Sequence, residues 1–289
     1  MPIFFEEYEA LKSSERWQEI IDLGINALKD DEITDKDKAF IKAKSTSCYY
    51  YLGKYTEANQ MATEALENAK KAGDSDLCVR SLYLISATYR ALASQASGTQ
   101  HEQYKKLSHD NIREALDRIS NSEVCNFTKA KVFFNAGALY HDLNCSYEMA
   151  EKYYQQAIEL FQSDSDDYNR CVIRNIRLMM DNKRIGTADE LIFFTKKIEE
   201  NINKETRTGV QFLQLLSKLF LSFGKYDKAL EYADRALKTA AAKSMHAELG
   251  MLNQVIVEIK NKESNNKNVS SSEASTVEEK PGEYAFKFR

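Results

Sequence analysis

The stretch FGKYDKALEYADRALKTA, from Phe223 to Ala240, contains a glycine followed by a row of small residues. Gly224 is expected to end one helix, and Ala229, Ala233 and Ala236 then recur at i, i+4 and i+7. That spacing places the three alanines on one face of the next helix, where small side chains let a partner helix approach closely. A single copy would indicate a tight helix pair, whereas recurrence would indicate an array of helical repeats.

The pattern does recur along the chain. YYYLGKYTEANQMATEAL contains Gly53 and Tyr55 at matching positions, followed by its own row of Ala58, Ala62 and Ala65. Weaker copies open at Trp17 and Tyr147 and in KRIGTADELIFFTKKI at Ile185, and a further unit fits between Tyr55 and Tyr147. The copies are roughly 40 residues apart, which is in the range of helical repeats.

A second pattern precedes each of these helices. In order, it is a large apolar residue, another large or apolar residue, a small residue and an aromatic one, at spacings of three, one and three positions. The best copies are Leu213, Leu216, Ser217 and Phe220; Phe133, Ala136, Gly137 and Tyr140; and Leu82, Ile85, Ser86 and Tyr89. Such a face suits a helix whose small residue lies against the alanine row of its partner.

Together these two faces resemble tetratricopeptide repeats, whose helix pairs carry a bulky, bulky, small, aromatic face followed by an alanine-rich face. The resemblance implies an all-α fold: an α-solenoid of about six helix pairs over residues 3–240, with a capping helix at 244–260. The chain lacks the proline that usually closes each unit, and its repeats exceed the usual 34 residues. It is therefore more similar to the longer-helix members, found among adaptor proteins and bacterial peptide-sensing regulators. The alternative is a helical domain with incidental alanine packing.

Composition divides the chain into a repeat domain over residues 1–262 and a tail over 263–289. In the capping helix, Leu249, Leu252 and Ile256 are expected to cover the last repeat while Glu248, Gln254 and Glu258 face water. The tail is rich in Ser, Asn and Glu, which predicts disorder. It ends in YAFKFR, which is either an incidental chain end or a docking motif for a partner or for this protein's own groove.

Charge and cysteine content narrow the functional classes. The net charge of −4 disfavours non-specific nucleic-acid binding, and no apolar stretch is long enough to predict a membrane span. Five cysteines without a CxxC motif favour a reducing compartment, and the first residues do not read as a secretory signal. We therefore expect a cytoplasmic protein that binds a protein or peptide partner.

The sequence contains no recognisable catalytic or cofactor motif. His101 and His109 lie beside what reads as an inserted loop, ASQASGTQHEQYKK, and are expected to be solvent-exposed rather than metal ligands. DSDDYN, beginning at Asp164, resembles the start of a calcium loop but has asparagines at its sixth and twelfth positions. We expect no cofactor and no metal, and an enzyme built from scattered residues remains a minor alternative.

The residues most informative about function lie on the first helix of each pair, on the face left over after core packing. There, stacked pairs are expected to form a concave groove. Arg170, Arg174 and Arg177 make a cationic stripe at i, i+4 and i+7. Tyr50 and Gln211 share the matching face, and the remaining groove residues are Arg80, Tyr83, Arg90, Lys131, Asn135, Gln214 and Lys218.

Guanidinium groups suit carboxylates, amides suit a peptide backbone, and tyrosines provide rigid contact area. This composition predicts a groove for an extended, acidic peptide or protein segment. Alternatively, the stripe makes ordinary ion pairs with Asp166, Asp181 or neighbouring helices.

The best match to the carboxylate clamp of chaperone-binding tetratricopeptide domains comprises Lys131, Asn135, Arg174, Gln211 and Leu215. Its last pair lacks the expected Lys and Arg, so that activity is not assigned. The main hypothesis is a non-catalytic adaptor or scaffold. The alternative is a regulator that changes conformation on binding a small signalling peptide.

Overall fold

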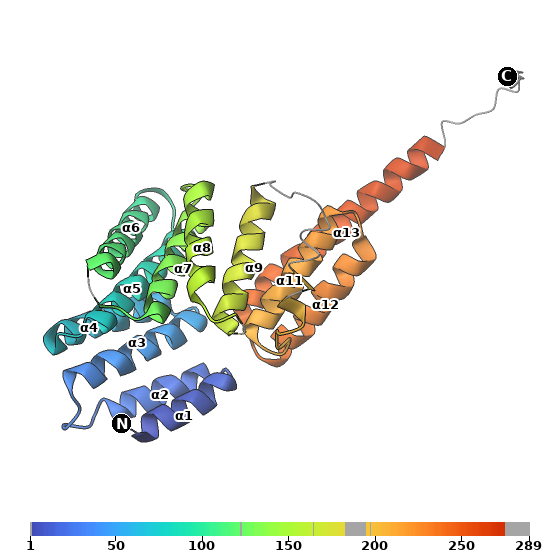
Figure 1. The fold of residues 1–289 in the computed structure, drawn as a ribbon. Coiled ribbons are helices and arrows are strands. Elements are labelled where there is room, and N and C mark those ends of the chain that lie inside the picture. The colour runs from blue at the N-terminus through green and yellow to red at the C-terminus, as the bar shows by residue number, and fades with distance from the viewer. Residues whose placement is uncertain (1, 122, 164, 183–194, 197, 275–289) are drawn as a thin grey trace, which may run out of the picture. The chain divides into compact units, whose positions relative to one another are not determined.

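The computed structural model describes residues 2–121, 123–163, 165–182, 195–196 and 198–274. All regular structure in these residues is helical (Figure 1). The chain forms two compact units, Met1–Ile202 and Asn203–Arg289, which are described separately below as unit 1 and unit 2.

The helices follow the predicted pairing. Unit 1 contains α1 (Pro2–Ser13), α2 (Trp17–Ala27), α3 (Asp35–Tyr51), α4 (Tyr55–Ala72), α5 (Ser75–Gln95), α6 (Gly98–Asn121), α7 (Asn126–Asp142), α8 (Tyr147–Leu160) and α9 (Asp166–Asp181). Unit 2 contains α11 (Arg207–Ser222), α12 (Tyr226–Ala242) and α13 (His246–Ala274). Most of the predicted partner of α9, KRIGTADELIFFTKKI, lies outside the described residues.

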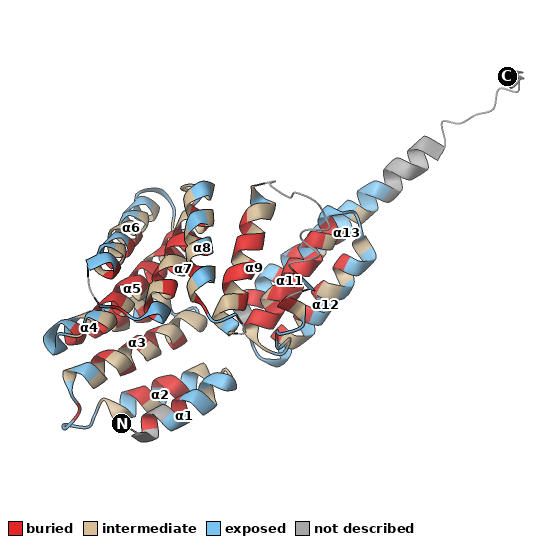
Figure 2. Ribbon diagram, viewed as in Figure 1, coloured by how far each residue is buried: buried red, intermediate tan, exposed pale blue. Residues whose placement is uncertain are grey.

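The alanine rows form the seams between paired helices. Ala229, Ala233 and Ala236 are fully buried, as are the three equivalent alanines of α4. The small position of the first helix meets this row: the Ser217 hydroxyl donates a hydrogen bond of 2.8 Å to the carbonyl oxygen of Ala229. At Gly137 a Cβ would lie 2.7 Å from the Tyr154 ring, so the α7–α8 seam leaves no room for a larger residue. Figure 2 shows the buried residues concentrated where helices face one another.

The glycines before α4 and α12 have the predicted role. Gly53 and Gly224 adopt φ values of 75° and 68°, a region that a residue without Cβ enters at little cost. Glu15 and Asn144 adopt φ values of 54° and 50° at the corresponding turns before α2 and α8. These two turns therefore form without glycine, which explains why the sequence pattern was weaker there.

Two details differ from the sequence-based expectations. The predicted inserted loop ASQASGTQHEQYKK lies in the repeat formed by α5 and α6, and it is helical except at Ala96 and Ser97. This repeat is longer than the others because its helices are longer. Glu248 does not face water, because its buried side chain accepts hydrogen bonds of 2.7 Å from Arg207. A partner 41 positions away cannot be identified from helical periodicity.

The capping helix also extends past its predicted end. Leu252, Val255 and Ile259 are buried, and Leu249 packs against the same core. The helix continues beyond Lys262 to Ala274, with mostly exposed side chains as far as Asn266. The final motif YAFKFR lies outside the described residues.

Candidate functional site: the inner face of unit 1

The first helices α3, α5, α7 and α9 form one layer of unit 1, and this layer is strongly curved. The Arg170 guanidinium on α9 donates a hydrogen bond of 2.8 Å to the Tyr51 hydroxyl on α3. In a flat layer with interaxial spacings of about 8 to 10 Å, these helices would be about 24 to 30 Å apart. Two side chains cannot span that separation, so the layer is concave. The side that carries this contact is called the inner face below.

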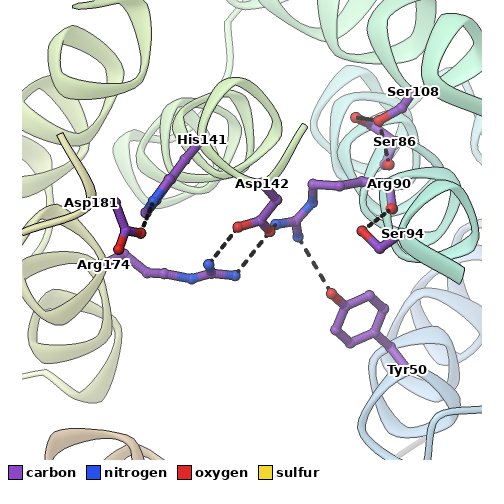
Figure 3. Close-up of polar contacts among 9 residues, drawn as sticks. All are labelled: Tyr50, Ser86, Arg90, Ser94, Ser108, His141, Asp142, Arg174 and Asp181. Atoms are coloured by element: carbon purple, nitrogen blue, oxygen red, sulfur yellow. Dashed lines mark hydrogen bonds and ion pairs between the residues drawn. The ribbon is translucent and has the colours of Figure 1, made fainter. Parts of the chain in front are cut away.

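Asp142, at the end of α7, lies at the centre of one polar cluster on this face. Its carboxylate accepts hydrogen bonds of 2.7 and 3.2 Å from the Arg174 guanidinium, and another from Arg90 (Figure 3). Arg90 also donates to the Tyr50 hydroxyl at 3.4 Å. In this cluster, formed by Tyr50, Arg90, Asp142 and Arg174, the carboxylate joins α5, α7 and α9, and Arg90 adds α3 through Tyr50.

The electrostatics of the cluster favour negative charge. Burial opposes ionisation of Asp142, but Arg174 and Arg90 outweigh it and hold the pKa of that carboxyl well below its usual range. Nearby, burial and the like charge of Arg174 lower the pKa of Arg177 to about 10. The carboxylates of Asp142 and Asp181 act in the opposite direction but do not offset the cost of burial.

A second cluster lies at the start of α9. Arg170 pairs with Asp166 at 2.7 Å, and Lys131 on α7 pairs with Asp167. Burial opposes ionisation of Asp167, yet Lys131 and Arg170 keep the pKa of its carboxyl below the usual value. This cluster holds α7 and α9 together beside the Tyr51 contact.

A third cluster combines cations with aromatic rings on α1, α3 and α5. The Lys44 ammonium lies 4.7 Å from the ring centroid of Tyr8 and 5.0 Å from that of Phe40. The Arg80 guanidinium lies 6.0 Å from the same Phe40 centroid, and its Nη2 pairs with Asp76 at 3.3 Å. Lys44 and Arg80 therefore both lie near the ring of Phe40, and the charge of Arg80 acts on Lys44.

Most of the other predicted groove residues are buried. Tyr83 is 7% exposed and belongs to the hydrophobic core around α5, α6 and α7. Asn135 is 8% exposed and donates its side-chain amide to the Lys131 carbonyl at 2.8 Å, within its own helix. Gln214 and Lys218 lie on α11 of unit 2, where Gln214 is buried and Lys218 exposed.

The structure thus contains the ion pairs that formed the alternative interpretation of the cationic stripe. Arg170 pairs with Asp166 as that alternative specified, and Arg174 pairs with Asp142 on a neighbouring helix. Asp181 lies 2.9 Å from the His141 ring nitrogen Nε2.

Sequence reasoning missed Asp142, Tyr51 and Lys44. Lys44 precedes Tyr51 by seven positions, or two helical turns, so both lie on one face of α3. That spacing could have placed Lys44 on the same face as Tyr51 from the sequence alone. The role of Asp142 could not be predicted from the sequence, because it depends on two arginines 52 and 32 positions away.

The described residues contain no group of three or more His, Cys, Asp or Glu side chains arranged to hold a metal ion. His101 is partly buried, with its Nδ1 lying 2.8 Å from the Ala93 carbonyl oxygen, and His109 lies 3.4 Å from the Cys145 sulfur. Neither is fully exposed, which corrects the expectation for both. None of the described helices has the length and apolar character needed to span a bilayer.

Comparison with known proteins identifies relatives in structure alone. No family model matches the sequence, and no curated protein matches it. A Rap protein complexed with competence and sporulation factor has a TM-score of 0.59 at 14% identity, covering 91% of this chain and 75% of that one. The Rap conjugation gene regulator of plasmid pLS20, in complex with the Phr* peptide, has a TM-score of 0.55 at 14% identity, covering 88% and 72%.

The apo form of the quorum sensor NprR from B. thuringiensis is also similar, with a TM-score of 0.52 at 13% identity, covering 89% of this chain and 75% of that one. At these identities the likeness concerns the fold. The chain has the all-helical, tetratricopeptide-like solenoid architecture of these proteins, which confirms the fold class expected from its repeats.

Proposed function

We propose that this chain is a non-catalytic interaction module that binds an extended, acidic peptide or protein segment on the inner face of unit 1. The observation that carries the proposal is the convergence of Arg90 and Arg174 on the single carboxylate of Asp142. Two guanidiniums present more N–H donors than one carboxylate can accept from. A ligand carboxylate therefore has donors available without breaking the Asp142 pairs.

The charge balance of the face supports an acidic ligand. Helices α3, α5, α7 and α9 together carry eleven Lys and Arg side chains but only seven carboxylates, which are Asp35, Asp37, Asp76, Asp142, Asp166, Asp167 and Asp181. The Nε–H of Arg90 is buried and has no hydrogen-bond acceptor among the described residues. A buried donor without an acceptor is unfavourable, so an added oxygen at this point would be stabilising.

The tyrosines of α3 add contact area of the kind that peptide-binding surfaces use. Tyr50 contacts the Tyr55 ring at a centroid distance of 5.2 Å, and Tyr51 contacts the Trp17 ring at 4.7 Å. These tilted ring pairs hold the tyrosines in place before any ligand arrives, which lowers the entropy lost on binding. One structurally similar protein was solved with competence and sporulation factor and another with the Phr* peptide, which is in keeping with a peptide ligand.

The cytoplasm is the proposed location of this activity. The five cysteines are all free thiols in the structure, in keeping with a reducing compartment.

Selection from a display library of random short peptides tests the proposal. The full chain should enrich sequences rich in Asp and Glu, and Arg174→Gln combined with Arg177→Gln should abolish that enrichment. Arg235→Gln is the matched control, because Arg235 is an exposed arginine on α12 of unit 2. Failure of the wild-type chain to enrich acidic peptides would contradict the proposal.

A second candidate function, a peptide-responsive regulator, is favoured by the Arg170–Tyr51 contact. This hydrogen bond joins two residues 119 positions apart and connects the first and last helices of the curved layer, α3 and α9. A ligand that competes for Arg170 would release α9 from α3 and let the layer open. Small-angle scattering with a selected peptide should then show a larger radius of gyration for the complex than for the free chain. An unchanged radius would favour the adaptor.

A further inference from the structure

The third cluster, around Lys44 and Arg80, has features that internal packing does not require. No carboxylate in the described part of the chain lies within ion-pair distance of the Lys44 ammonium, which instead lies against Tyr8 and Phe40. Other basic groups on the inner face have such a partner, as Lys131 has in Asp167 and Arg174 has in Asp142. Lys44 is therefore a half-buried positive charge whose counter-charge is missing from the described structure.

Its surroundings increase this demand for an anion. Burial lowers the pKa of Lys44 to about 8, and the nearby Arg80, Lys12 and Lys131 act in the same direction. Glu9, on α1, acts against the shift but pairs with Lys12 at 3.3 Å. A negative group placed beside the Lys44 ammonium would reverse the cost of holding this charge in a partly desolvated site.

Arg80 supplies a second unsatisfied donor in the same place. Its Nη2 contacts Asp76 and lies 3.5 Å from the Thr128 hydroxyl, but its buried Nε–H has no acceptor among the described residues. Lys44 and Arg80 both lie within 6.0 Å of the Phe40 ring centroid, and Arg80 is the charge that acts most strongly on Lys44. The two cations are therefore neighbours, and we infer that one small anion can lie between them. A carboxylate has the size and two oxygens for this arrangement.

The distance from this cluster to the Asp142 cluster can be estimated from helix geometry. Lys44 and Tyr50 lie six positions apart on α3, which is about 9 Å at 1.5 Å per residue. Arg80 and Arg90 lie ten positions apart on α5, which is about 15 Å by the same rise. An extended segment advances at most about 3.3 to 3.6 Å per residue, so about three to four residues cover this distance.

We propose that Lys44 and Arg80 form a second anion subsite, and that the bound segment carries two carboxylates three to four residues apart. The first is received between Lys44 and Arg80, and the second by the arginines around Asp142. This inference rests on the proposed function, because it assigns the spacing of acidic groups within the same ligand. The proposed function requires only an acidic segment, whereas this inference also specifies the spacing of its two carboxylates.

Two blocked synthetic peptides of identical composition provide the test. One carries two glutamates separated by three small residues, and the other carries the two glutamates side by side. Titration calorimetry on the full chain should show at least tenfold tighter binding of the spaced peptide. Lys44→Gln should remove that preference, whereas Lys38→Gln, an equal loss of charge on the same helix, should retain it.

The outcomes separate the two proposals. The subsite is overturned if the wild-type chain binds both peptides equally, or if the preference for the spaced peptide survives Lys44→Gln. The proposed acidic groove would still hold in either case, provided that Arg174→Gln with Arg177→Gln abolishes binding. Absence of binding by either peptide would overturn both.

A titration of Lys44 gives an independent readout. After reductive ¹³C-methylation, its methyl resonance is assigned by its absence in Lys44→Arg. Saturation with the spaced peptide should raise the pKa of Lys44, because a nearby carboxylate favours the charged form. An unchanged pKa in the bound chain would contradict direct contact.

Discussion

Helices α9 and α11 are both 16-residue first helices, yet the faces that match in the repeat register carry different side chains. On α9, Arg170 and Arg174 pair with acidic side chains and a tyrosine supplied by α3, α7 and α9 itself. On α11, Gln214 is buried among apolar neighbours, and Lys218, which matches Arg177 in the repeat register, is exposed. The repeat register alone therefore does not make a charged site. The adjacent first helices must also supply the complementary groups.

Unit 2 uses its buried ion pair for a different purpose. Arg207, at the start of α11, pairs with Glu248 near the start of α13, with side chains only 12% and 4% exposed. This pair fastens the capping helix to the last repeat. Asp142 in unit 1 instead shares one carboxylate between two arginines at an exposure of 25%. The first arrangement is a closed structural pair, whereas the second leaves donors for a ligand.

Removing the central carboxylate should have the largest effect. Asp142→Asn leaves Arg90 and Arg174 without their shared counter-charge, and we expect a loss of about 2 to 4 kcal/mol, below the range for full burial because a quarter of the side chain is exposed. Asp110→Asn, which breaks an exposed pair with Arg113, should cost less than about 1 kcal/mol. Urea unfolding measures both. Equal losses would show that the Asp142 cluster contributes no more to the free energy of unfolding than an exposed ion pair does.

The same variant predicts a pH dependence. Because the folded-state pKa of Asp142 is lowered, its stabilising effect is complete above the unfolded value of about 3.9 and is lost as the pH falls below it. The stability difference between wild type and Asp142→Asn should therefore shrink below about pH 4. A difference that stays constant down to acid unfolding would contradict the assigned ion pairs.

The alanine seams should respond alike in both units, since they share one packing pattern. Ala62→Leu in unit 1 and Ala233→Leu in unit 2 should each destabilise by about 1 to 3 kcal/mol, because neither seam has room for added methylenes. Ala241→Leu, at an exposed position of α12, serves as the control and should change stability by less than about 0.5 kcal/mol. Unchanged melting of both seam variants would place these alanines outside a helix interface.

The unpaired charge of Lys44 predicts a smaller effect with the opposite sign. Its lowered pKa means that the unfolded chain binds more protons between about pH 8 and pH 10.4, so wild-type stability should gain relative to Lys44→Gln across that range. We expect a relative gain on the order of 1 kcal/mol, since solvent screens a half-buried ammonium. Comparing the two proteins removes the contribution of other titrating groups. A relative loss on raising the pH would show that Lys44 already has a carboxylate partner.

These contrasts also indicate what the sequence could predict. The Ala229 row and Gly224 follow from helical periodicity and backbone sterics, which are local, and the structure confirms both. The stripe of Arg170, Arg174 and Arg177 likewise follows from spacing on one helix. The pair of Arg170 with Asp166, one turn away on the same helix, follows from spacing too. The contacts with Tyr51 and Asp142 do not, because they come from other helices.

The burial of polar residues was also difficult to predict from the sequence. Glu248 was expected to face water because its neighbours on α13 alternate with apolar residues, but an arginine from another helix makes its burial favourable. Lys44 was overlooked for the converse reason. A lysine in a helix reads as solvent-exposed until the rings of Tyr8 and Phe40 are seen to enclose it.

The most direct test of the central claim is the affinity of the full chain for an acidic peptide, measured with and without the inner-face arginines. Arg174→Gln combined with Arg177→Gln should weaken binding at least tenfold, or about 1.4 kcal/mol, and binding to the wild-type chain should weaken as salt is raised. Arg235→Gln should bind as wild type does, with all proteins assayed well below their melting temperatures. A folded double variant with unchanged affinity and unchanged salt dependence would contradict the assignment of the inner face as the binding surface.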